Sequence, residues 1–107
     1  MDQDDLASEI DRRLNGRRIT SQQSAYAELS DIMLTVTLIN EYMSQERQEQ
    51  YTRLDSIIEK LKRWLDRLVK KLTEIVEELG DGVSFSISVG TGVSVTVNFP
   101  VLGSSSA

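Results

Sequence analysis

Apolar residues recur at helical spacing from the start of the chain. Leu6, Ile10 and Leu14 lie four positions apart and form one apolar stripe, while the surrounding residues are mostly charged. Asn15-Gly16 follows, and both residues tolerate the left-handed conformation found where helices end. The pattern therefore predicts a short, acidic helix within residues 1–16.

A second helical segment begins after this stop. Thr20 and Gln23 have the spacing of a capping box, and neither Gly nor Pro occurs from Gln22 to Leu79. We therefore expect one long helix over residues 20–79, in preference to two helices folded back on each other. If the helix is interrupted, we expect the break in residues 44–50, which are polar all round.

The later part of this segment, residues 51–79, has an unbroken heptad pattern that predicts a coiled-coil seam. Its apolar face is wider than a two-stranded seam needs, because Ile57, Trp64, Val69 and Val76 extend it on both sides. This width favours three or more helices around one core, and we expect a homo-oligomer, with a trimer as the first choice. The expected seam consists of Tyr51, Leu54, Ile58, Leu61, Leu65, Leu68, Leu72, Ile75 and Leu79.

Beyond Gly80-Asp81-Gly82 the apolar period changes to two, which predicts an antiparallel β-hairpin over residues 83–99. A lone hairpin is marginal in water. Its apolar face must be covered by helices of the same chain, by hairpins of other copies, or by lipid. We expect residues 103–107 to form a flexible tail. The apolar face consists of Val83, Phe85, Ile87, Val89, Val93, Val95, Val97 and Phe99.

Charge is distributed unevenly around a net value of −5. An acidic start precedes a basic stripe, and no charged side chain follows Asp81. The acidic balance does not favour nucleic acid as a partner. The stripe and Trp64 are compatible with an amphipathic helix on an anionic membrane. The continuous heptads favour a coiled coil with a solvated basic face instead. The stripe consists of Lys60, Lys62, Arg63, Arg67, Lys70 and Lys71.

Catalytic chemistry finds little support in the composition. The chain has neither Cys nor His, which removes thiolate sites and the commonest general base and metal ligand. We therefore expect no catalytic residues, no cofactor and no metal site, and do not expect an enzyme. Neither a secretory signal nor a long apolar run is present, so a cytoplasmic or particle-associated location is the default expectation.

These patterns together predict a mainly α protein with a small β element, in which a coiled-coil or bundle helix precedes a C-terminal hairpin. The expected function is that of a non-enzymatic structural or interaction protein, such as a scaffold, adaptor or fibre-like component. It would self-associate through the seam and present or bury the hairpin, and a larger protein is a further candidate partner. The alternative is a membrane-active protein with a basic helix and an insertable hairpin. Strands that span a bilayer need ~9–11 residues, so the seven-residue strands expected here weaken this alternative.

Overall fold

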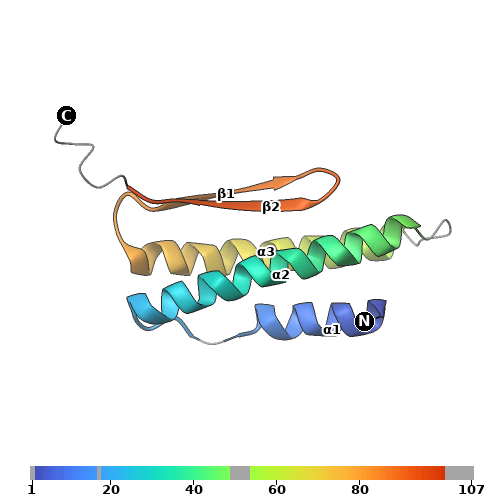
Figure 1. The fold of residues 1–107 in the computed structure, drawn as a ribbon, viewed down its shortest axis with the longest axis horizontal. Helices are drawn as coiled ribbons and strands as arrows, with labels where there is room; N and C mark the ends of the chain where they lie inside the picture. The colour runs from blue at the N-terminus through green and yellow to red at the C-terminus, as the bar shows by residue number, and fades with distance from the viewer. Residues whose placement is uncertain (1, 17, 49–53, 101–107) are drawn as a thin grey trace.

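The computed structural model describes residues 2–16, 18–48 and 54–100 and is built in three layers (Figure 1). Helices α2 and α3 lie side by side in the middle layer, with α1 on one side and the hairpin on the other. Strand β1 lies on the α3 side of the hairpin and β2 on the α2 side. The elements are α1 (Gln3–Leu14), α2 (Gln22–Gln48), α3 (Leu54–Leu79), β1 (Ser84–Val89) and β2 (Val93–Asn98).

Local sequence accounts for the ends of α1. Asp2 caps the helix, and its carboxylate accepts a hydrogen bond of 2.8 Å from the backbone N–H of Asp5. Acidic residues lie in the first turn and basic residues in the last, which suits the helix dipole. The stripe of Leu6, Ile10 and Leu14 is buried, so α1 packs along one face onto the middle layer.

Two helices replace the single long helix expected over residues 20–79. Helix α2 ends at Gln48, α3 begins at Leu54, and the two pack against each other. Residues 49–53 lie outside the described residues, whereas residues 44–48 of the expected break belong to α2. A heptad stripe requires an apolar neighbour but does not specify which chain supplies it. Folding back lets α2 supply that neighbour within the same chain.

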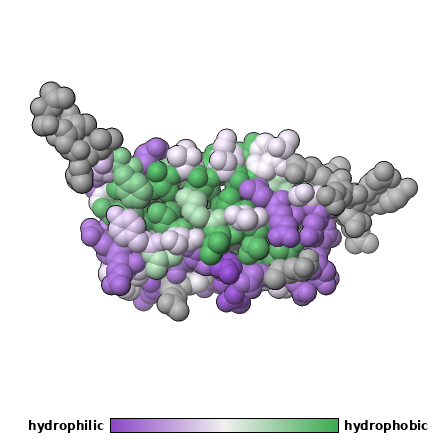
Figure 2. Space-filling model, viewed as in Figure 1, coloured by the Kyte–Doolittle hydropathy of each residue, from purple (hydrophilic) through white to green (hydrophobic). Residues whose placement is uncertain are grey.

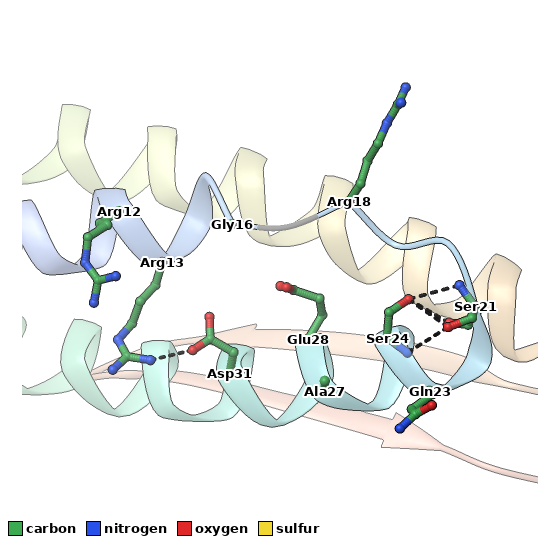
Figure 3. A pocket seen from close by; sticks show the side chains of 10 residues that line it. All are labelled: Arg12, Arg13, Gly16, Arg18, Ser21, Gln23, Ser24, Ala27, Glu28 and Asp31. Atoms are coloured by element: carbon green, nitrogen blue, oxygen red, sulfur yellow. Dashed lines mark hydrogen bonds and ion pairs between the residues drawn. The ribbon is translucent and has the colours of Figure 1, made fainter.

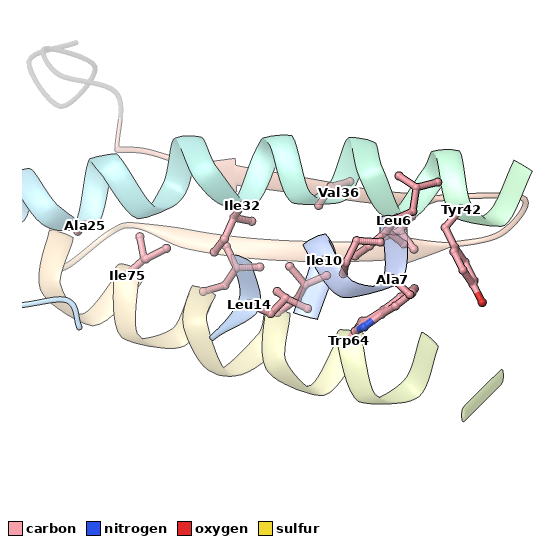
Figure 4. Close-up of a cluster of buried hydrophobic side chains, with 14 residues drawn as sticks. Leu6, Ala7, Ile10, Leu14, Ala25, Ile32, Val36, Tyr42, Trp64 and Ile75 are labelled. Carbon is pink, nitrogen blue, oxygen red and sulfur yellow. The ribbon is translucent and has the colours of Figure 1, made fainter. Parts of the chain in front are cut away.

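Most of the described part of the expected seam is covered inside the chain. Leu68, Leu72 and Ile75 are fully buried in a core shared with α1 and α2, as is Trp64 (Figure 4). Ile58 is 47% exposed. Tyr51 and the side chain of Leu54 lie outside the described residues. The remaining seam residues pack partly buried against the core: Leu61, Leu65 and Leu79. The stripe therefore does not need a second chain in order to be buried.

The predicted C-terminal β-hairpin is confirmed. Its strands are antiparallel and pair from Ser84↔Asn98 to Val89↔Val93. The sequence pattern left three possible covers for its apolar face. In the structure, helices of the same chain cover part of that face. Val93 is buried, whereas Val83 is half-buried and Val89 and Phe99 are exposed. The others on that face pack partly buried against the core: Phe85, Ile87, Val95 and Val97.

Candidate interaction surface

The outward side of α2 is uncharged over most of its length. Between Thr20 and Asn40 the only charged residues are Glu28 and Asp31. Glu28 is buried and accepts a hydrogen bond of 2.9 Å from Nζ of Lys71 on α3. Asp31 forms an ion pair with Arg13 of α1. Both carboxylates are thus engaged by neighbouring helices, and neutral side chains remain on the surface.

Several of these neutral side chains are large and apolar. Tyr26 is 52% exposed and Leu34 56%, and Met33 is also exposed. The ring of Tyr26 stacks on Phe99, with centroids 6.3 Å apart, which connects the surface of α2 to the end of β2. Apolar and neutral residues gather over α2 and the hairpin in Figure 2, whereas hydrophilic residues gather over the α1 layer. Exposed apolar patches of this kind mark interaction sites more often than chance.

The edge of β2 borders this surface. The side-chain amide of Asn40 donates to the carbonyl of Val93 at 2.8 Å and accepts from its N–H at 2.6 Å. Asn40 belongs to α2, so the backbone polar groups of Val93 point away from β1. Because these directions alternate along an antiparallel strand, the N–H groups of Val95 and Val97 point to the same outer edge. Within the described part of the chain, neither N–H has a hydrogen-bond acceptor.

We call this region the neutral face. It combines exposed apolar side chains with an unpaired strand edge, and it comprises Tyr26, Met33, Leu34 and Phe99 together with the outer edge of β2 at Val95 and Val97. The apolar hairpin residues follow from the sequence pattern, whereas the α2 residues of this face were not predicted. The available signal was the long run from Thr20 to Asn40 with only two charges.

The basic stripe is largely used inside the fold. Asp11 of α1 lies 3.3 Å from Arg63 and 3.7 Å from Arg67, and it accepts a hydrogen bond of 2.9 Å from the indole N–H of Trp64. Trp64 is therefore a buried anchor between α1 and α3, and it is not placed to meet a membrane.

The stripe also contains four lysines, of which two are engaged within the fold and two are exposed. Lys71 binds Glu28, and Nζ of Lys60 donates to the hydroxyl of Tyr42 at 3.2 Å while lying 5.5 Å from the centre of its ring. Lys62 and Lys70 are exposed, and neither forms an ion pair within the ranges that the structure describes. The stripe thus leaves few cations free for an external partner.

A cleft of about 670 Å³ lies at the junction of α1 and α2 (Figure 3). Ser21 and Ser24 form a reciprocal cap at the start of α2, with backbone-to-hydroxyl distances of 2.9 and 3.1 Å. Arg13 is bound to Asp31, and Arg18 points away from the cleft. The lining residues are Arg12, Arg13, Gly16, Arg18, Ser21, Gln23, Ser24, Ala27, Glu28 and Asp31.

Most of the charged side chains around this cleft are paired, and Arg18 is the described exception. Glu9 accepts a hydrogen bond of 2.9 Å from Nε of Arg12, and this bond lowers the pKa of Glu9 below its ordinary value and raises that of Arg12. No group of three or more metal-ligating side chains is present in the described residues. The arginines at the cleft are thus mostly engaged by carboxylates of the same chain, and the neutral face remains the best-supported site.

Among the described residues, no helix combines the length and apolar content that a bilayer crossing requires. Comparisons with protein-family models, with curated proteins and with solved structures give no match. The site must therefore be interpreted from its own chemistry.

Proposed function

We propose that this chain is a non-enzymatic interaction protein that self-associates through the neutral face. The observation that carries the proposal is the exposed apolar, charge-free surface of α2 beside the unpaired edge of β2. Two identical faces meet without like charges opposing each other, so association costs no electrostatic repulsion. Burial of the exposed apolar side chains supplies the driving force.

The proposed surface differs from the seam that the heptads suggested. Because the α3 stripe is buried within the chain, association through it would first require α2 and α3 to separate. Association through the neutral face leaves the core intact. A two-fold dimer is the simplest closed assembly for such a face, and we propose it in place of the trimer. Scaffold, adaptor or fibre-like roles, including binding to a larger protein, would build on this dimer.

Solution mass tests the proposal. Sedimentation equilibrium across a wide concentration range should show a monomer–dimer equilibrium for the parent chain. Leu34→Lys places a charge on the neutral face and should weaken dimerisation at least tenfold. Val69→Lys is the matched control, because Val69 is a similarly exposed apolar residue on α3, and it should leave the equilibrium unchanged. A parent chain that stays monomeric at millimolar concentration would overturn the proposal.

A membrane-active role is the second candidate. The exposed Tyr26–Phe99 pair beside a charge-free surface is compatible with contact with lipid. Trp64 and four cations of the basic stripe bind groups of the same chain, so little basic surface remains to attract anionic lipid. These contacts disfavour the membrane-active role. Leakage from anionic vesicles at a low protein-to-lipid ratio, reduced by Leu34→Lys, would favour this role over self-association.

A further inference from the structure

We propose that the second copy adds to the outer edge of β2, so that two hairpins form one continuous four-stranded antiparallel sheet about a two-fold axis. This inference rests on the proposed self-association and specifies its geometry. Val95 and Val97 direct unpaired backbone N–H groups to this edge, and an added strand would satisfy them. The edge carries no Lys, charge or internal Pro, which are the usual protections against strand addition.

The two edges of the hairpin differ in their surroundings. β2 lies on the side of α2, whose exposed residues from Gln22 to Asn40 are all neutral. β1 lies on the side of α3, which carries exposed charges along its length, at Glu59, Lys62, Asp66, Lys70, Glu74 and Glu77. Two-fold pairing through β1 would bring two such helices together and trap some of these charges. Pairing through β2 brings two neutral helices together.

Asn40 sets the register of the pairing. It already occupies both backbone polar groups of Val93, and β2 ends at Asn98, so within β2 an added strand can bond only at Val95 and Val97. A two-fold axis at Thr96 pairs Val95 with the partner's Val97 and Val97 with the partner's Val95, which forms four hydrogen bonds. An axis at Val95 would place Val97 opposite Val93 of the partner subunit, whose backbone groups are already bonded to Asn40. Only the two hydrogen bonds between the two copies of Val95 would then form. The axis therefore passes at Thr96.

This register also buries the exposed apolar residues of α2. β2 runs antiparallel to α2, with Val93 level with Asn40 and Phe99 level with Tyr26. Residues 93–99 of the strand and residues 26–40 of α2 each span roughly 20 Å. Their midpoints, Thr96 and residue 33, are therefore level with each other. Met33 and its neighbour Leu34 thus lie near the two-fold axis, where the second copy would cover them.

Single cysteine variants test this geometry cleanly, because the chain contains no Cys. Facing residues at a non-hydrogen-bonded antiparallel position have Cα atoms ~4.5 Å apart, which permits a disulfide. Thr96→Cys should therefore give a covalent dimer under mild oxidation. Ser86→Cys is the matched control, because Ser86 is the exposed cross-strand partner of Thr96 on β1. Ser94→Cys tests register, because in the proposed pairing it faces the partner's Asn98.

The expected result is that Thr96→Cys cross-links at least tenfold faster than either control at equal concentration. Faster cross-linking of Ser86→Cys would assign the interface to β1 and overturn the inference while leaving self-association standing. Equal rates at all three positions, with a dimeric parent, would place the interface away from the hairpin edges and would likewise overturn it. A parent chain that is monomeric by sedimentation would remove both the inference and the proposed function.

Discussion

At the scale of single residues, Asn40 joins two elements that lie far apart in the sequence. Its amide pairs with the backbone of Val93 as a neighbouring strand would, and so fixes the tip of the hairpin on α2. The adjacent Gly92 makes this approach possible, because a Cβ there would lie 2.7 Å from Oδ1 of Asn40. A Cβ at Gly90, on the other side of the turn, would meet nothing within 4 Å.

The two glycines should therefore respond differently to substitution. Gly92→Ala should displace Asn40 and lower the free energy of unfolding by about 1–3 kcal/mol, since two buried backbone groups lose their partner. Gly90→Ala, the control, should change it by less than about 1 kcal/mol. Urea denaturation followed by circular dichroism measures both. Equal effects of the two substitutions would show that the contact between Asn40 and Val93 does not stabilise the fold.

Some features of the fold follow from local sequence pattern, whereas contacts between distant positions do not. The Gly90-Thr91-Gly92 turn and the burial of Leu68 and Leu72 follow from local periodicity. The buried Lys71–Glu28 pair and the bond from Trp64 to Asp11 join positions more than 40 residues apart. No local pattern encodes such pairs, because they exist only once α2 folds back onto α3 and α1 packs against both.

At the scale of elements, the heptads of α3 predict which face is buried but not which chain covers it. The apolar series of α2 and α3 are out of phase, since Met43 and Tyr51 are eight positions apart, and polar residues separate them. This phase change was the available sequence signal for two helices. The prediction of one helix rested on the absence of Gly and Pro, although a helix can end without either residue. The hairpin was predictable because its period of two differs sharply from the helical pattern.

Unfolding at different concentrations tests whether the α3 stripe is covered within one chain. Leu68 is fully buried, so Leu68→Ala should cost about 2–5 kcal/mol, whereas Val69→Ala at the exposed neighbouring position should cost less than about 1 kcal/mol. In the Leu34→Lys background, where the neutral face is blocked, the urea midpoint should not change with protein concentration. A midpoint that falls on dilution would show that the stripe is covered by other chains.

At the scale of the whole molecule, folding back gives dimensions of 56 × 29 × 20 Å and a Cα radius of gyration of 15.7 Å. The short α1 and the hairpin cover opposite sides of the α2–α3 pair, so each layer protects apolar surface of the middle one. This arrangement leaves the outward side of α2 as the main neutral surface. The proposed interface is thus a consequence of the fold, since a continuous helix would have left the α3 stripe exposed as well.

Small-angle X-ray scattering distinguishes the two architectures directly. A continuous helix over residues 20–79 would be about 90 Å long and would alone have a radius of gyration of about 26 Å, which is the length of a rod divided by the square root of twelve. The folded-back chain should approach about 16 Å at the lowest concentration. The parent should then increase in both mass and radius as concentration rises, whereas Leu34→Lys should keep the low value throughout. A radius above about 25 Å at low concentration, with monomeric mass, would contradict the packing of α2 on α3 and the interface built on it.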